Sequence, residues 1–317
     1  MSEQAACAKE PLDLSIIIVN WNTRDLLAQC LQSIYDTVSN LDFEVIVVDN
    51  ASNDGSQDMV RQEFPDVRLI ANTENLGFAK ANNQAIRRNQ GRYALLLNSD
   101  TFVRENTIEQ VVAFMDAHPE AGMTGCTLLY EDGRLQPSCS TFPTLFTEFC
   151  IATGLDKLFP KSPLFGKYRM TYWDFDDVRE VDVILGAFML VRATAIDEVG
   201  LMDERYFMYS EEVDWCYRFK EQGWKMYFYP DVEAVHLKGG SSRQVQVEML
   251  VQMYRSRIGF FRRYYGKRSA TVLKVLVGFS CLLRIGPGAW FYFSSDNPYT
   301  RQKHRAFWQL LRALPTL

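Results

Sequence analysis

The sequence predicts an α/β protein with a doubly wound, mostly parallel sheet of Rossmann-like type, followed by a helical C-terminal extension. Short apolar runs such as 14–20 (LSIIIVN) and 43–50 (FEVIVVDN) are rich in β-branched residues and do not alternate with polar ones. Such runs are typical of strands buried on both faces. Helical stripes lie between the runs, and a strongly basic segment closes the chain. These features indicate strand–helix units with right-handed crossovers and a tail of different character.

The first hundred residues alternate strand and helix patterns. Between the first two strands, apolar residues recur at helical spacing, at positions 26, 27, 30, 31, 34 and 38. The expected order is strand 14–20, helix 23–38, strand 43–50, helix 53–64, strand 67–72, helix 77–90 and strand 92–100.

The next part of the chain is less regular. A helix is expected over 104–118, because Ile108, Val111, Val112 and Met115 would share one face. The remaining expected segments are a strand and hairpin over 122–138 turning at Asp132-Gly133, a loop-rich insertion over 142–180, a strand over 181–192 interrupted at Gly186, a helix over 210–223 and two short strands within 225–240.

The composition is that of an ordinary globular protein. The chain has 317 residues, of which 47% are hydrophobic and 23% charged, which excludes a disordered chain. Its seven cysteines form no CxxC pair, so we expect reduced thiols in the cytoplasm and neither a zinc knuckle nor a disulfide framework. The N-terminal MSEQAACAKE contains acids and no apolar core, so no signal peptide is expected.

The net charge of −5 hides a strong asymmetry. From Met249 to Leu317 there are twelve Lys and Arg against one acid, so this segment carries +11 and the rest of the chain −16. Such a division points to a tail that meets an anionic surface. Nucleic acid is not expected as that surface, because no nucleic-acid-binding motif accompanies the charge.

The tail also has an amphipathic pattern. On a helical wheel, Lys267, Lys274, Gly278, Cys281 and Arg284 lie on one side. Apolar side chains take the other side, namely Val272, Val275, Leu276, Phe279, Leu282 and Leu283. We therefore expect 262–293 to lie in the interface of an anionic membrane, anchored by Trp290, Phe291, Tyr292 and Phe293. The alternative is a helix packed on the body of the protein or on a second subunit of a homo-oligomer.

Polar side chains follow several of the predicted strands at the point where each strand ends. Asn20, Asp49, Asn98 and Asp100 come directly after or at the end of buried runs. In a doubly wound sheet these carboxyl ends face one crevice, where ligands bind. The chain contains no GxGxxG after its first strand, no GxxxxGK[ST] and no HExxH, so the common dinucleotide, P-loop and zinc-protease sites are not expected.

An ordered set of motifs resembles family 2 glycosyltransferases, most closely the bacterial rhamnosyltransferase branch. The motifs are SIIIVNWN, VIVVDNASNDGS, NLGFAKANNQAI, LLLNSDT, GAFMLVR and MYSEEVDWCYR. The resemblance implies a GT-A catalytic domain over 13–240, with a donor half over 13–103 and an acceptor half over 104–240, and leaves 241–317 as the extension. It also implies a nucleotide-sugar donor, a divalent metal and inversion at the anomeric carbon.

The resemblance further implies roles for particular residues. The nucleotide sugar would contact Asn20, Asp49, Asn75, Gly77, Asn98 and Asp100. Asp100, in the position of the family's DxD motif, would hold Mg²⁺ or Mn²⁺ together with His236. These ions take few protein ligands and bridge to diphosphate oxygens. The structural alternatives are a simple turn at Asn98–Asp100 and a structural histidine.

The acidic pair of the family corresponds to Glu211 and Glu212. The resemblance implies Glu212 as the catalytic base, Glu211 as the next candidate and Asp214 as a positioning group. The alternative is an acidic helix N-terminus that merely complements the helix dipole. The resemblance places Gly186, Ala187, Phe188 and Trp215 on the acceptor side.

The function expected from the sequence is therefore an inverting sugar transferase of cell-surface polysaccharide synthesis. Its donor would be a dTDP or UDP sugar such as dTDP-rhamnose, and its acceptor a glycan or polyprenyl-linked glycan at the cytoplasmic face of the inner membrane. Two alternatives are a catalytically silent sugar- or lipid-binding scaffold and a sugar nucleotidyltransferase. The latter needs a Gly-rich basic loop after the first strand, which 20–27 (NWNTRDLL) does not supply.

Overall fold

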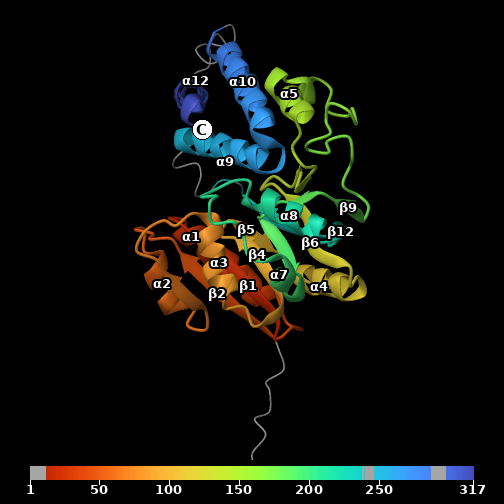
Figure 1. Cartoon of the computed structure of the whole chain (residues 1–317). Coiled ribbons are helices and arrows are strands. Elements are labelled where there is room, and N and C mark those ends of the chain that lie inside the picture. Colours follow the sequence, from red (N-terminus) through yellow and green to blue (C-terminus); the bar gives the residue numbers. More distant parts are fainter. Residues whose placement is uncertain (1–11, 238, 240–245, 287–297) are drawn as a thin grey trace, which may run out of the picture.

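The structure is a computed structural model that describes residues 12–237, 239, 246–286 and 298–317. Figure 1 shows a twisted sheet with helices against both faces and a group of helices stacked above it. The helices of that group are α5 (Leu145–Thr153), α9 (Gln246–Tyr264), α10 (Gly266–Ile285) and α12 (Pro298–Ala313), and α12 continues into the short 3₁₀ helix η2 (Leu314–Thr316).

The first part of the sheet is parallel, as the sequence predicts. Its strands are β1 (Leu12–Asn20), β2 (Phe43–Asp49), β3 (Arg68–Ala71) and β4 (Gly91–Asn98). β1 lies between β2 and β4, with Asn20 beside Asp49 and Val19 beside Asn98. This register brings the polar strand ends to one edge of the sheet.

The second part of the sheet is mixed. Within the described residues the strand order is β3-β2-β1-β4-β11-β6-β12-β5, with β7 paired to β6 and β9 paired to β12. β11 runs antiparallel to both β4 and β6, and β5 runs antiparallel to the end of β12, so Thr101 pairs with His236. The strands are β5 (Thr101–Val103), β6 (Ala121–Leu129), β7 (Leu135–Gln136), β9 (Arg179–Val181), β11 (Phe188–Arg192) and β12 (Lys225–His236), and β8 (Cys139–Ser140) pairs separately with β10 (Val183–Ile184).

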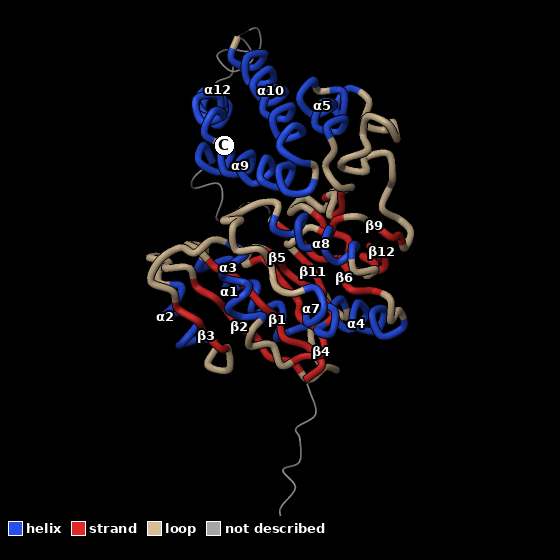
Figure 2. The backbone as a smooth tube through the Cα atoms, in the orientation of Figure 1, coloured by secondary structure: helices blue, strands red, loops and turns tan. Residues whose placement is uncertain are grey.

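Helices cover both faces of this sheet (Figure 2). A hydrophobic core lies on each of the two faces. Along β1, Ile16 and Ile18 point into one core and Ile17 into the other, as strand alternation requires. The first core is covered by α1 (Arg24–Thr37), α2 (Ser56–Glu63) and α4 (Thr107–Ala117). The second is covered by α3 (Phe78–Ile86), α7 (Ala193–Val199) and α8 (Glu211–Glu221).

The C-terminal helices belong to the second core. Phe260 and Phe261 of α9 and Leu273 of α10 are fully buried and join the same apolar cluster as Trp215 and Phe228. The described part of the extension, residues 246–286 and 298–317, is therefore packed against the remainder of the chain, as one of the two sequence-based alternatives has it.

Helix α10 has two different apolar faces. Leu273, Val277 and Cys281 are buried against the protein, whereas the predicted apolar side, including Val275 and Phe279, is exposed. Among the described helices, none is both long and apolar enough to cross a bilayer. The predicted aromatic anchors at 290–293 lie outside the described residues.

Three local expectations differ from the structure. Residues 225–236 form one strand, β12, with a register shift between Tyr229 and Glu233 around Pro230, where two short strands were expected. The insertion expected to be loop-rich contains α5 and α6 (Leu155–Leu158), because Thr144 caps α5 with a reciprocal side-chain bond to Thr147. The short elements β5 and α7 were not predicted.

Candidate active site

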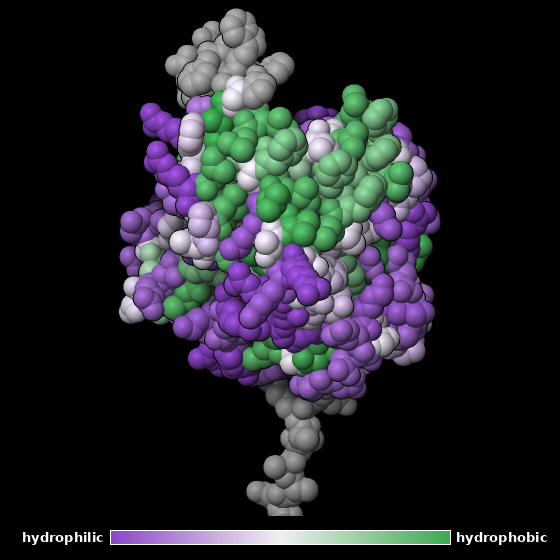
Figure 3. Space-filling view, turned by 45° about the horizontal axis from the view of Figure 1, so that its top comes forward, coloured by the Kyte–Doolittle hydropathy of each residue, from purple (hydrophilic) through white to green (hydrophobic). Residues whose placement is uncertain are grey.

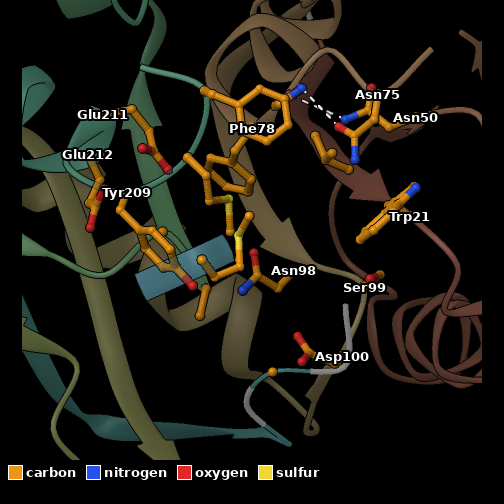
Figure 4. Close-up of a pocket in the computed structure, with 18 of the residues that line it drawn as sticks. Trp21, Asn50, Asn75, Phe78, Asn98, Ser99, Asp100, Tyr209, Glu211 and Glu212 are labelled. Carbon is orange, nitrogen blue, oxygen red and sulfur yellow. Dashed lines mark hydrogen bonds between the residues drawn. The ribbon is translucent and has the colours of Figure 1, made fainter. Parts of the chain in front are cut away.

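A cleft of about 510 Å³ opens at the carboxyl ends of β1 and β4. This volume is in the range of small-molecule binding sites. Its walls come from three directions: the strand ends, the start of α3, and the segment that leads into α8, with the first turn of α9 adding Glu248 and Met249. Figure 4 shows Asp100 and Ser99 on one side of the cleft and Glu211 and Glu212 on the other, with Asn98 between them.

A chain of hydrogen bonds ties the strand ends together. The Asn20 amide donates to Asp49 Oδ2 (2.9 Å), and the Thr23 hydroxyl donates to Asn20 Oδ1 (2.7 Å). Thr23 Oγ1 lies 2.9 Å from Ser99 Oγ. Because all four residues are buried, these bonds hold the ends of β2, β1 and β4 in a fixed arrangement below the cleft.

Asp100 and His236 meet at one end of the cleft. Asp100 Oδ1 lies 3.3 Å from His236 Nε2, and both side chains are buried. The pairing of β5 with the end of β12 brings these distant positions together. Gln136 Oε1 lies 3.0 Å from His236 Nδ1, so Gln136 fixes the orientation of the imidazole ring with Nε2 facing Asp100. Asn98 Nδ2 lies 3.4 Å from the same Nε2 atom.

These residues fit a divalent cation that keeps most of its coordination for substrate and water. A carboxylate oxygen and an imidazole nitrogen 3.3 Å apart are spaced as two adjacent ligands of one ion would be. Among the described residues, no group of three or more His, Cys, Asp or Glu could enclose a metal by itself. The donor set therefore suits Mg²⁺ or Mn²⁺ bound jointly with a diphosphate, rather than a closed structural metal site.

The start of α3 forms the second wall. Asn75 Oδ1 accepts from the Gly77 N–H (3.0 Å), and the Asn50 amide donates to Gly77 O (3.3 Å). The Phe78 N–H donates to Phe207 O (2.7 Å), which joins the start of α3 to the segment that leads into α8. Gly77 has φ +80°, and a Cβ there would lie 2.2 Å from Phe207 O, so only glycine permits this approach.

Glu211 and Glu212 form the third wall. Glu211 is 3% exposed, and the Oε2 atoms of both residues are shielded from solvent with no hydrogen-bond partner among the described residues. Burial raises the pKa of Glu211 well above the ordinary glutamate value, and the charge of Glu212 raises it further. The preceding residues Tyr209 and Ser210 both have φ +66°, an uncommon conformation that marks a constrained turn.

Arg257 of α9 balances the charge near this pair. Burial raises the pKa of Glu212, while backbone N–H groups and the Arg257 charge oppose that rise. The Arg257 guanidinium is held by Glu148 Oε1 (3.0 Å) and by the Tyr168 hydroxyl (2.5 Å). A side chain of the extension thus makes Glu212 easier to ionise than burial alone would allow.

Five of the predicted site residues lie behind the cleft wall and do not line it. The oxygens of Asp49 accept from Asn20, Ser52 and Gln57. These bonds place Asn20 and Asp49 beneath the strand ends.

The other three residues of this set are Phe188, Asp214 and Trp215. Phe188 is 2% exposed and belongs to the first core. The Trp215 indole is fully buried and donates to Gly200 O (2.8 Å). Asp214, also fully buried, accepts from Arg218 (2.9 Å), Arg263 (3.0 Å) and the Tyr264 hydroxyl (2.8 Å). These contacts join α8 to α9 and leave Asp214 turned away from the cleft.

The remaining predicted site residues line the cleft: Asn75, Gly77, Asn98, Asp100, Gly186, Ala187, Glu211, Glu212 and His236. The sequence motifs did not identify Gln136, Arg257, Phe207 or Tyr209. Gln136 reaches His236 only through the register of β7 on β6, and Arg257 depends on how α9 packs. The run MYSEE could have drawn attention to Tyr209, because it directly precedes the acidic pair.

Comparisons with known proteins identify the family of the chain. Residues 15–174 match the model of the family described as Glycosyl transferase family 2. The chain is 28% identical over 254 residues to N-acetylglucosaminyl-diphospho-decaprenol L-rhamnosyltransferase of Mycobacterium tuberculosis, covering 77% of this chain and 82% of that protein. It is 26% identical over 232 residues to rhamnosyltransferase WbbL of Escherichia coli, covering 70% and 82%. The resemblance to the rhamnosyltransferase branch is thus confirmed.

Solved structures confirm the GT-A-like fold. The mannosyltransferase PcManGT from Pyrobaculum calidifontis, solved with GDP-Man and Mn²⁺, superposes with a TM-score of 0.53 at 17% identity, covering 96% of this chain and 86% of that one. GalNAc-T7, solved with UDP, GalNAc and Mn²⁺, superposes with a TM-score of 0.55 at 16% identity, covering 78% and 48%. At these identities the likeness concerns the fold alone.

Proposed function

The chain belongs to glycosyl transferase family 2, and on that premise we propose that it transfers a sugar, with inversion, from a nucleoside diphosphate to a hydroxyl of a glycan or lipid-linked acceptor. One observation carries the proposal. Asp100 and His236 at one end of the cleft face the buried Glu211 and the half-buried Glu212 at the other. A cleft with these two ends can hold a diphosphate and deprotonate a hydroxyl across the sugar between them.

The donor would lie along the strand ends. Asn75 and Gly77 border the place for the nucleoside, and Asp100 and His236 would hold Mg²⁺ or Mn²⁺ against its diphosphate. A cation bound there supplies positive charge against the charge that develops on the departing diphosphate. Gln136 contacts His236 Nδ1 and so holds the ring with its Nε2 atom facing Asp100, where both could coordinate the cation.

Glu212 is the group that we assign as base. The acceptor oxygen attacks the anomeric carbon from the face opposite the diphosphate, its proton passes to the Glu212 carboxylate, and the bond from the anomeric carbon to the diphosphate oxygen breaks. Arg257 favours the ionised form of Glu212, whereas Glu211 is more deeply buried and keeps its proton more strongly. Asp214 positions α8 and therefore acts through Glu211 and Glu212 rather than on the substrate.

The sugar and its acceptor are proposed from the relatives. Two similar proteins are named as rhamnosyltransferases, and the mycobacterial one is named for a lipid-linked acceptor. We propose a dTDP- or UDP-linked donor, with dTDP-rhamnose as the first candidate, and a polyprenyl-linked acceptor. Such an acceptor places the reaction at the cytoplasmic face of the inner membrane, and the basic extension supports peripheral association with anionic lipids there.

A transfer assay with a panel of donors tests the proposal. The purified chain is incubated with Mn²⁺, a short-chain lipid N-acetylglucosaminyl diphosphate and either dTDP-rhamnose, UDP-glucose or GDP-mannose. The expected product carries one added rhamnose, whose anomeric configuration by NMR is opposite to that of the donor. Retention of configuration would contradict the mechanism, and transfer of glucose or mannose instead would contradict the assigned donor.

A further inference from the structure

The exposed apolar side of α10 continues across a second segment that is distant in the sequence. On α10, Val275 is 67%, Phe279 51% and Leu282 56% exposed. On α5, Phe146 and Phe149 are 42% and 41% exposed. Figure 3 shows hydrophobic residues gathered into one green region over these two helices. A contiguous apolar area of this kind marks an interaction site on a soluble protein.

The two helices form one unit. α5 packs directly against α10, and the Arg284 guanidinium of α10 donates to Ala152 O of α5 (3.3 Å) and to Ser280 O (3.1 Å). On the opposite side of α10, Leu273 and Val277 are buried in the core. α10 is therefore apolar on both sides, but the described protein covers only one of them. Exposed apolar side chains gathered on one side of a helix favour an apolar environment on that side as well.

We propose that α5 and α10 together form a membrane-docking face that inserts to the headgroup–acyl boundary of an anionic bilayer. The inference deepens the proposed membrane association and rests on it, but it replaces docking by the tail alone with docking by two packed segments. The acid-free helix α10 also carries Lys267, Arg268 and Lys274, of which Lys267 and Arg268 are exposed. A helix with an exposed apolar face, basic side chains and no acids is suited to bind anionic lipid.

The position of the face relates it to the proposed reaction. Helix α9 begins at the cleft, where Glu248 and Met249 line the wall, and leads into α10. Docking by α5 and α10 would hold the lipid of a polyprenyl-linked acceptor in the same bilayer as the enzyme. The sugar of that acceptor could then approach the cleft along α9 without leaving the membrane surface.

Vesicle co-sedimentation of the full chain tests the face. The vesicles are made of phosphatidylglycerol with phosphatidylethanolamine, and pure phosphatidylcholine serves as the neutral reference. One variant carries Phe146→Ser and Phe149→Ser on α5, and another carries Val275→Ser and Phe279→Ser on α10. The matched control carries Leu135→Ser and Val178→Ser, which replace exposed apolar residues outside the face.

Each face variant is expected to lower the vesicle partition coefficient about tenfold or more, because each loses two side chains that would enter the lipid. The control should bind as the unchanged chain does. If only the α10 variant weakens binding, the tail docks alone and the two-segment face is wrong. If the unchanged chain does not bind anionic vesicles, the membrane association itself fails.

Two further readouts distinguish membrane docking from catalysis and from self-association. Transfer to a short-chain soluble acceptor should be the same in all variants, because the substituted residues are outside the cleft. If the unchanged chain transfers no sugar to the soluble acceptor, the transferase proposal is contradicted. The vesicle result still tests the docking proposal separately. If the variants instead turn a dimer into a monomer by light scattering and bind vesicles normally, the face is a contact between two copies of the chain and the proposal is overturned.

Discussion

Glu211 and Glu212 are neighbours in the sequence but have different electrostatic surroundings. Glu211 is buried and feels the charge of Glu212, whereas Glu212 also feels Arg257. When the pKa values of two carboxyl groups are separated in this way, one group can be ionised and accept a proton while the other stays protonated and neutral. Here Glu212 would be the proton acceptor and Glu211 the neutral neighbour. The division is a property of packing around α8 and cannot be read from the order of the two residues.

Replacing Glu212 by Gln should lower kcat by about 100-fold or more, because the group that accepts the hydroxyl proton is lost. Nucleotide binding should remain unchanged. In the unchanged enzyme, kcat/KM should rise with pH through a pKa above the ordinary glutamate value of 4.5, since the base must be ionised. Steady-state kinetics across pH measures both effects. Glu221→Gln, an exposed position on the same helix, is the control; near-normal kcat in the Glu212 variant would remove it as base.

Replacing Glu211 by Gln should stabilise the protein at neutral pH. A carboxyl group whose pKa is raised by folding favours the native state at low pH, and that contribution is lost as pH rises through its folded pKa. Glu211→Gln has no carboxyl group to ionise, so its stability does not fall in this pH range. Its Tm should therefore exceed that of the unchanged chain by several degrees at neutral pH, and the two Tm values should converge below pH 4.5. Thermal unfolding as a function of pH measures the difference. A variant that is less stable at neutral pH would contradict burial as the cause of the shift.

The polar residues at the strand ends could be predicted from the sequence. Which of them line the cleft and which hold neighbouring strands together could not. Asp100 and His236 were expected to meet and they lie 3.3 Å apart. Asn20 and Asp49 were also expected in the nucleotide site, yet their side chains bond to each other and to their neighbours below the cleft. Whether a strand-end side chain faces the ligand or braces a neighbouring strand depends on turn geometry that the sequence pattern does not report.

At the scale of elements, the start of α3 lies unusually close to the segment that leads into α8. Gly77 combines a left-handed backbone with a close contact to the carbonyl of Phe207. The contact belongs to the wall of the cleft, so a change there affects both the fold and the site.

Gly77→Ala should lower stability by about 1–3 kcal/mol and weaken nucleotide binding, because a Cβ would displace the 207 segment from α3. Gly133→Ala is a matched control, since Gly133 also has positive φ but no atom lies within 4 Å of the added Cβ. Chemical denaturation and nucleotide titration of both variants make the comparison. Equal effects in the two variants would show that backbone strain alone accounts for the loss.

The regular elements of the first hundred residues were predictable because buried parallel strands and amphipathic helices have strong patterns. Those of 142–180 were not, since α5 exposes Phe146 and Phe149 and buries Thr147 and Glu148, the reverse of the pattern that marks an amphipathic helix. A proline usually interrupts a strand, so two short strands were expected around Pro230. In the structure Pro230 lies at an irregular point of the pairing with β6, and the single strand β12 continues past it.

At the scale of the whole molecule, the described extension and the rest of the chain are expected to unfold as one cooperative structure. They share a hydrophobic core, and Asp214 links α8 to Arg263 of α9 within it. The boundary expected near residue 240 marks a change in composition, but packing continues across it. Sequence composition reports surface charge well and buried contacts between distant segments poorly.

Asp214→Asn should lower the free energy of unfolding by about 3–5 kcal/mol, because two arginines lose a buried anionic partner. Unfolding should still occur in one transition, seen at the same midpoint by far-UV circular dichroism and tryptophan fluorescence. Asp197→Asn, at an exposed position of α7, controls for the change of charge. Two separated transitions in the unchanged chain would show that the extension folds independently.

The measurement that tests the account most directly is calorimetric binding of UDP, dTDP and GDP with and without Mn²⁺, to the unchanged chain and to Asp100→Ala. We predict that dTDP or UDP binds only when Mn²⁺ is present, and that Asp100→Ala removes this binding while the protein stays folded. Binding that needs no metal and survives the substitution would contradict the assignment of Asp100 and His236. Failure of all three nucleotides to bind would contradict the cleft as a donor site.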